Sequence, residues 1–147
     1  MLTFYRFDHA KGQGGEIGRM EFDSRWSPSF DLSPDGSEIA AVDPKGIGNR
    51  IRRIPINGGN TSEVEVPGRK ALEVLFWAAD GKGWFVSSVM PGNGSCLLHV
   101  NPRGESKVLF EQPQDGLMTW GVPSHDGKQL AFLRWNNGTN VWMIDDF

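Results

Sequence analysis

The residues that could perform acid–base, nucleophilic or metal chemistry are few and dispersed along this sequence. The three histidines, His9, His99 and His125, lie far apart, and the single cysteine, Cys96, lies in an apolar run where we expect it to be buried. Zinc sites need several Cys or His ligands at close spacing. A hydrolase serine needs a Gly-x-Ser-x-Gly turn, which the sequence lacks. The sequence therefore predicts no catalytic centre, no metal site and no cofactor, and we expect the chain not to be an enzyme.

The charge balance disfavours nucleic-acid and membrane partners. Fifteen basic and 18 acidic residues give a net charge of −3, so there is no basic excess to neutralise phosphates. Arg50, Arg52 and Arg53 cluster, and we expect them on a solvated strand, with a phosphate-binding patch as the alternative. No apolar stretch is long enough to cross a bilayer and no signal-peptide pattern is present, so the chain as encoded is expected in the cytoplasm, without direct membrane contact.

An internal repeat in the sequence indicates the strands and turns that must position any site. Asp-Gly pairs occur at Asp35-Gly36, Asp80-Gly81 and Asp126-Gly127, with spacings of 45 and 46 residues, and each pair is followed by a short apolar run. Asp-Gly between two apolar runs indicates a β-hairpin, because glycine adopts positive φ without steric cost.

A second marker keeps the same phase. Alternating segments end at Ile56-Asn57, Val100-Asn101 and Ile144-Asp145, each 44 residues apart, and Phe7-Asp8 fits the same slot. One unit then contains four short strands, which we name A to D: A enters the Asp-Gly turn, B leaves it, C ends in Asn or Asp, and D follows after a turn such as Gly12-Gln13-Gly14-Gly15. Four strands in about 45 residues are typical of a β-propeller blade. A β-sandwich, the main alternative, does not explain the fixed period.

The segment Ser33 to Ala40, with the sequence SPDGSEIA, resembles the core of the bacterial TolB-like repeat, also called the WD40-like or PD40 repeat. Ser124 to Ala131 is a second copy with His125 in place of proline, and Ala78 to Phe85 is a divergent third. The resemblance implies a six- or seven-bladed propeller that contacts proteins or senses ligands. Such repeats stand alone or form part of larger proteins, among them Ser/Thr kinases, and related propellers cap serine peptidases. In a membrane-anchored parent of the kinase kind, the propeller would be periplasmic.

We therefore expect an all-β chain, a single propeller segment of about three four-stranded blades over residues 1–147. Residues 1–24 would supply the C and D strands of a split blade, 25–68 and 69–113 two whole blades, and 114–147 a blade without its D strand. Three blades do not readily close a ring, and the C edge at Val141 to Ile144 would be unpaired. Two copies would give six blades if Ile17 to Phe22 of one chain supplied the missing D strand of the other. The alternative is a fragment of a longer parent.

Propeller geometry places a binding site at the mouth of the central channel, near the innermost A strands. The residues that would project there are Arg25, Trp26, Glu73, Thr119 and Trp120. The alternative for Trp26 and Trp120 is packing between blades. The expected function is that of a non-catalytic module that binds or senses a protein or small molecule of unknown identity and forms a homodimer. The alternative function is that of an accessory propeller of a larger enzyme, either a Ser/Thr kinase sensor or a serine peptidase cap.

Overall fold

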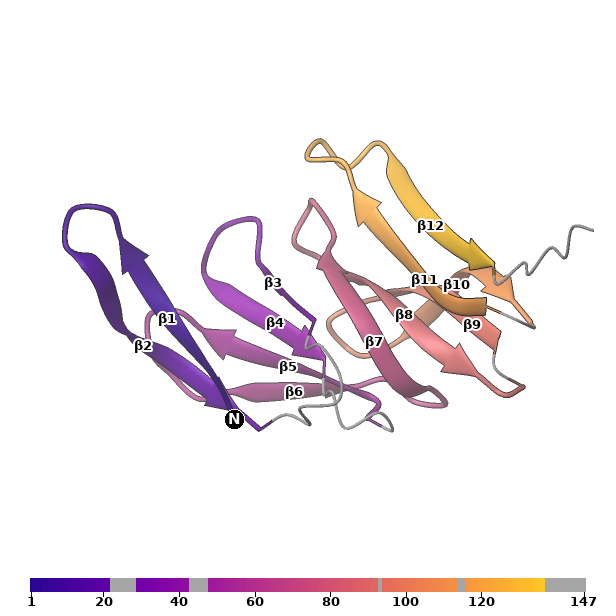
Figure 1. Cartoon of the computed structure of the whole chain (residues 1–147), viewed down its shortest axis with the longest axis horizontal. Coiled ribbons are helices and arrows are strands. Elements are labelled where there is room, and N and C mark those ends of the chain that lie inside the picture. Colours follow the sequence, from indigo (N-terminus) through magenta and orange to yellow (C-terminus); the bar gives the residue numbers. More distant parts are fainter. Residues whose placement is uncertain (22–28, 43–47, 93, 114–115, 137–147) are drawn as a thin grey trace, which may run out of the picture.

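The computed structural model describes residues 1–21, 29–42, 48–92, 94–113 and 116–136, and all regular structure in these ranges is β (Figure 1). The prediction of an all-β chain is thus confirmed for the described residues. Within these ranges, twelve strands form four antiparallel sheets. The strands are β1 (Leu2–Asp8), β2 (Gly12–Met20), β3 (Phe30–Leu32), β4 (Glu38–Val42), β5 (Arg50–Pro55), β6 (Ser62–Glu65), β7 (Lys70–Trp77), β8 (Trp84–Met90), β9 (Gly94–Val100), β10 (Ser106–Gln112), β11 (Gly116–Pro123) and β12 (Leu130–Asn136).

The two central sheets each contain four strands in simple chain order. One is β3-β4-β5-β6 and the other β7-β8-β9-β10, so that each strand pairs with its successor in the predicted order A to D. Two hairpins, β1–β2 and β11–β12, form the two-stranded sheets. Figure 1 shows the sheets following one another along an open arc, with β1–β2 at one end and β11–β12 at the other. The predicted C edge at Val141 to Ile144 lies outside the described residues.

The three Asp-Gly turns have nearly identical geometry. Gly36, Gly81 and Gly127 have φ of 70°, 67° and 69°, values in the left-handed region that favours glycine. The amide of each glycine donates to the carbonyl oxygen three residues earlier, over 2.8–2.9 Å. The acceptors are Ser33, Ala78 and Ser124. The sequence repeat is therefore also a repeat of local structure.

The carboxyl group of Asp35, in the first of these turns, should titrate at unusually low pH. The Ser33 hydroxyl donates to Asp35 Oδ1 over 2.7 Å, and the Ser37 amide and hydroxyl also donate to that oxygen. These bonds lower the pKa of Asp35 from 3.8 to about 2, so they stabilise the fold above pH 3.8 and the effect is lost as the pH falls toward 2. Ser33→Ala should raise the Asp35 pKa part of the way back to 3.8, measured by NMR titration of the carboxyl carbon. Ser124→Ala, at the same position of the third turn, should leave Asp35 unchanged; an unmoved Asp35 pKa in Ser33→Ala would contradict this assignment.

The first hairpin is longer than the sequence analysis predicted. The glycines from position 12 to 15 were expected in a turn, but β2 begins at Gly12, which pairs with Asp8. The carboxylate of Asp8 accepts hydrogen bonds from the amides of Ala10 and Lys11, at 2.8 and 3.2 Å. These bonds stabilise a turn between Asp8 and Gly12, so the remaining glycines belong to the strand. Within the strand, a Cβ on Gly14 would come within 2.5 Å of the Arg6 carbonyl oxygen. This glycine therefore permits close approach of the two strands.

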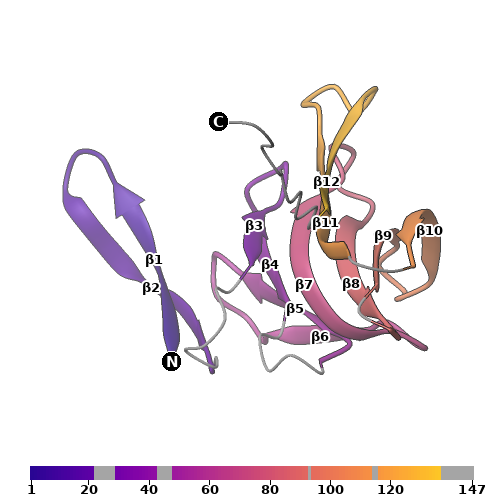
Figure 2. The same cartoon turned by 45° about the vertical axis from the view of Figure 1, so that its right-hand side comes forward.

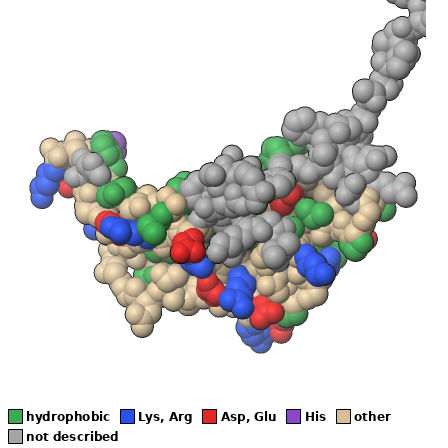
Figure 3. Space-filling view, turned by 60° about the horizontal axis from the view of Figure 1, so that its bottom comes forward, with side chains coloured by type: hydrophobic (Ala, Val, Ile, Leu, Met, Phe, Trp, Pro, Cys, Tyr) green, Lys and Arg blue, Asp and Glu red, His purple; other side chains and the backbone are tan. Residues whose placement is uncertain are grey.

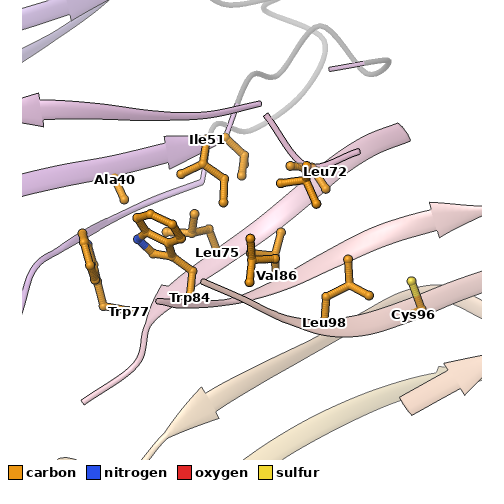
Figure 4. Packing of buried hydrophobic residues seen from close by; sticks show 12 residues of the cluster. Ala40, Ile51, Leu72, Leu75, Trp77, Trp84, Val86, Cys96 and Leu98 are labelled. Carbon is orange, nitrogen blue, oxygen red and sulfur yellow. The ribbon is translucent and has the colours of Figure 1, made fainter. Parts of the chain in front are cut away.

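The main hydrophobic core lies between the two central sheets (Figure 4). Strand β4 contributes Ala40 and Val42, and β8 contributes Trp84 and Val86. The rings of Trp77 and Trp84 lie 4.9 Å apart between their centroids. The remaining buried members come from β5, β7 and β9 and from Val66; they are Ile51, Leu72, Leu75, Cys96, Leu98 and Val100. This face-to-face packing joins the two sheets into one body.

A second core cluster joins the β1–β2 hairpin to the first central sheet. Its buried members are Phe4, Met20, Ile39, Ala41 and Ile54. Because side chains alternate along a strand, β4 directs Ile39 and Ala41 into this cluster and Ala40 and Val42 into the main core. Strand β4 is therefore packed on both faces, between one sheet and the next.

The first strands of successive sheets lie side by side. Strand β3 contacts β7, and β7 in turn contacts β11 (Figure 2). The β3–β7 contact is polar: the Leu75 amide donates to Ser29 Oγ over 3.0 Å, and the Trp77 amide donates to Asp31 Oδ2 over 2.9 Å. The Trp77 indole also donates to the Asp31 carbonyl oxygen over 3.2 Å. These bonds fix how one sheet is set against the next.

Candidate functional site

Three of the five predicted site residues can be placed. Glu73 lies on β7, and Thr119 and Trp120 lie on β11, the neighbouring first strand. Arg25 and Trp26 lie outside the described residues. Glu73 and Thr119 each precede the aspartate of their Asp-Gly turn by seven residues, so they occupy the same position of the repeat.

Glu73 is half-buried, and one of its two carboxyl oxygens has no hydrogen-bond partner among the described residues. Its Oε2 is enclosed and makes no hydrogen bond. Burial raises the pKa of Glu73 above 4.5, because removal from water disfavours the charged form. An enclosed carboxylate gains most from a cation that replaces the lost hydration. The group is therefore suited to hold an amine or a guanidinium.

Glu73 lies within a β-bulge of β7. Leu72 pairs with Ser88 and Leu75 pairs with Val86, so one more residue of β7 than of β8 lies between these pairs. The Val74 amide donates instead to the Ser87 hydroxyl over 3.0 Å. Bulges redirect side chains and are common beside functional sites. A strained residue lies nearby: Ala71 has a φ of 48°, in a region that residues other than glycine seldom adopt.

The two predicted site residues on β11 differ in burial. Thr119 is fully buried, and its Oγ1 lies 2.7 Å from the Ser95 hydroxyl of β9. This bond ties the last hairpin to the second central sheet. Trp120 is half-buried, as expected of a side chain that packs between sheets. Glu73 is thus the placed residue of the predicted set with an enclosed side-chain oxygen that makes no hydrogen bond within the described part of the chain.

The arginine cluster forms ion pairs within its own sheet. Arg50 and Arg52 lie 3.0 and 2.8 Å from the two carboxylate oxygens of Glu63, and Arg53 lies 2.6 Å from Glu38. Figure 3 shows basic side chains next to acidic ones on one face of the molecule. Two glutamates offset two of the three positive charges, so the arginines form a ladder of ion pairs within the sheet, which favours a structural role over a phosphate patch.

The single cysteine is buried, as predicted. Burial raises the pKa of the Cys96 thiol above 9.0, although the nearby Arg69 acts in the opposite direction. The Arg69 guanidinium donates to Cys96 Sγ over 3.7 Å. A thiol with a raised pKa is a poor nucleophile. In the described part of the chain, no group of three or more His, Cys, Asp or Glu side chains could hold a metal ion.

A cleft of about 540 Å³ lies between the second central sheet and the β11–β12 hairpin. Sequence reasoning did not predict it, although the repeat places the second and third Asp-Gly turns on neighbouring sheets. A Cβ on Gly127 would lie 3.3 Å from the Ala79 Cβ, which shows how close these turns are. Polar lining residues are Asp80, His99, His125, Asp126, Lys128 and Gln129. Both aspartates already accept hydrogen bonds within their own turns, so their role here is to shape the turns.

No protein-family model matches the chain, and no curated protein matches it either. Among the described residues, no helix is long and apolar enough to cross a membrane.

Proposed function

We propose that the chain is a β-propeller segment of TolB-like repeats that acts as a non-catalytic binding or sensing module. Support comes from the repeated Asp-Gly geometry, from the four-stranded sheets in chain order and from their face-to-face succession along an arc. The first strands of neighbouring sheets contact one another, as the innermost strands of propeller blades do. The proposal includes association with a second copy, because about three repeat units do not readily close a propeller ring.

The observation that carries the binding role is the enclosed Oε2 of Glu73, which accepts no hydrogen bond from any described residue. The residue lies on β7, the first strand of its sheet, and is half-buried within a β-bulge of that strand. Partly buried groups with perturbed pKa values and no structural partner are typical of binding sites. The ligand is accordingly a molecule or protein segment that presents a cationic group, an amine or a guanidinium, to this strand.

A titration with N-acetyl-arginine amide, followed by amide NMR shifts, tests this role. We expect shifts around residues 72–75 and at Ser87, which the bulge joins to this segment. Glu73→Gln should weaken binding at least about tenfold, which corresponds to about 1.4 kcal/mol, because it removes the charge and keeps the shape. The matched control is Glu105→Gln, which alters an exposed carboxylate that is paired with Arg103.

The pH dependence provides a second readout. Because the pKa of Glu73 is raised, part of the population is protonated and unable to pair with a cation near that pKa. Binding of the probe should therefore strengthen as the pH rises through this value, and this dependence should vanish in Glu73→Gln. Equal shifts in wild type and Glu73→Gln, or no localised shift at any probe concentration, would refute the proposed site.

A further inference from the structure

The cleft beside the second and third Asp-Gly turns lies at a place that aromatic side chains fill elsewhere in the same chain. Counted from the aspartates of the Asp-Gly turns, Pro123 and Leu130 of the last hairpin correspond to Trp77 and Trp84 of the second central sheet. Strand pairing agrees with this correspondence. Trp77 pairs with Trp84 between β7 and β8, and Pro123 pairs with Leu130 between β11 and β12. The two pairs therefore occupy the same place in successive sheets.

Between the two central sheets this place is filled. The rings of Trp77 and Trp84 lie 4.9 Å apart between their centroids and belong to the main core. Figure 4 shows Ala40 of the first central sheet beside these rings. The Trp77 indole also donates to the carbonyl oxygen of Asp31 over 3.2 Å. The space between these sheets thus holds two indole rings, one of which is hydrogen-bonded to the facing sheet.

Between the second central sheet and the last hairpin the same place is partly empty. Pro123 and Leu130 present a pyrrolidine ring and an isobutyl group where the first interface has two indoles, and both residues line the cleft of about 540 Å³. On the facing sheet, Phe85 stands at the position of Ala40 and fills part of the space. The remaining cleft follows from the replacement of two tryptophans by smaller side chains.

The two sheets pack tightly farther from the turns. Gly121 corresponds to Leu75, which is buried in the main core. A Cβ on Gly121 would nevertheless lie 2.9 Å from the side chain of Leu97 and 3.2 Å from that of Leu130. Leu97, on β9, is itself buried. The open volume therefore lies at the level of Pro123 and Leu130, next to the turns.

The walls of the cleft suit a flat aromatic ring that carries one hydrogen-bonding group. Phe85 and Leu109 provide apolar surface, and Leu109 is 41% exposed. The imidazole of His99 lies 5.4 Å from the ring of Phe85, its cross-strand partner, and His125 lines the cleft from the third Asp-Gly turn. A neutral imidazole offers one donor and one acceptor nitrogen. Either histidine is thus suited to bind an N–H or O–H group at the edge of a stacked ring.

We propose that this cleft binds a free aromatic molecule with an N–H or O–H group on its ring, an indole or a phenol. Its volume of about 540 Å³ is within the range of about 300–1,000 Å³ that is typical of small-molecule pockets. The ligand ring takes the place that the two indoles have in the first interface, and its polar group faces the histidines. Glu73 does not line the cleft, so this second site goes beyond the proposed function.

A titration with indole, followed by amide NMR shifts, tests the site. We expect localised shifts at residues 78–80, at His99 and at residues 124–130, and none at residues 72–75, where the arginine probe is expected to act. A tryptophan side chain of another protein presents the same chemistry, so N-acetyl-tryptophan amide is the second probe. Tighter binding of indole supports a free molecule as the ligand. Tighter binding of the peptide-like probe would overturn the free molecule in favour of a protein side chain.

Leu130→Trp introduces the tryptophan of the equivalent position and should fill the cleft. We expect this variant to weaken indole binding at least about tenfold, because the new ring occupies the space of the ligand. The midpoint of chemical denaturation should rise, because more apolar surface is buried. The matched control is Leu133→Trp, on the same strand but on its other face, which should leave indole binding unchanged.

The double variant His99→Ala/His125→Ala tests the hydrogen-bonding groups. It should bind indole several-fold more weakly than wild type while circular dichroism shows an unchanged fold. His9→Ala, which removes an exposed histidine near the first hairpin turn, is the control and should bind indole as wild type does. No localised shift with either probe, or an indole affinity that neither Leu130→Trp nor the double variant changes, would overturn the inference without affecting the Glu73 titration.

Discussion

Replacing Trp84 with alanine is expected to lower the free energy of unfolding by about 3–5 kcal/mol. The side chain is fully buried in the main core, and it is the largest fully buried side chain in the part of the chain that the structure describes. Figure 4 shows it between Ala40 and Val86, beside Trp77. Truncation would leave a cavity where the two central sheets meet, and tightly packed strands close such cavities only in part. Chemical denaturation at one fixed protein concentration measures the loss, because association would also contribute to stability.

The indole nitrogen of Trp84 makes a second variant informative. Nε1 is buried and makes no hydrogen bond, which by itself costs about 1–3 kcal/mol. Trp84→Phe removes this donor and keeps most of the aromatic volume, so it should destabilise clearly less than Trp84→Ala. Leu109→Ala, which truncates a 41% exposed side chain on β10, is the control and should change the free energy of unfolding little. A Trp84→Ala variant within about 1 kcal/mol of wild type would mean that this contact contributes little to the core.

Local chemistry explains what the sequence could predict of the fold. Asp-Gly turns are determined by four or five neighbouring residues and by the φ that glycine allows, so three copies were recognisable without any tertiary information. The order of strands followed from the same markers, because consecutive strands joined by short turns pair with each other. The ion pairs of Arg50, Arg52 and Arg53 are less predictable, since their partners Glu38 and Glu63 are set by the register of β5 against two neighbours.

The candidate site depends on contacts between strands, which local sequence patterns do not predict. Glu73 was expected near the end of an A strand and lies on β7, but its enclosure depends on a bulge, which is a mismatch between two strands and cannot be recognised in either strand alone. Thr119 occupies the same repeat position, yet its hydroxyl is paired with Ser95 because β11 packs on β9. The cleft at the Asp-Gly turns likewise arises from the offset between neighbouring sheets, which no single repeat encodes.

A buried glycine lies in the outer part of the interface between the central sheets. Gly104, in the connection between β9 and β10, is buried and has a φ of 84°. A Cβ at this position would collide with the carbonyl oxygen of Glu65, on β6 of the other central sheet. Gly104→Ala should therefore lower the free energy of unfolding by about 2–5 kcal/mol, the combined cost of a left-handed alanine and of an overpacked contact.

Gly68 offers the matched control for this substitution. It has a φ of 74°, and a Cβ built on it would meet no atom within 4 Å. Gly68→Ala should therefore cost only the conformational part, about 1–2 kcal/mol. The difference between the two variants in chemical denaturation measures the close approach of the two sheets at Glu65. Because the backbone of Glu65 is held by pairing with Arg50 on β5, it cannot move away without disturbing the sheet. Equal destabilisation of the two variants would show that the sheets separate readily at this point, and that their relative position is determined by the Trp77–Trp84 core alone.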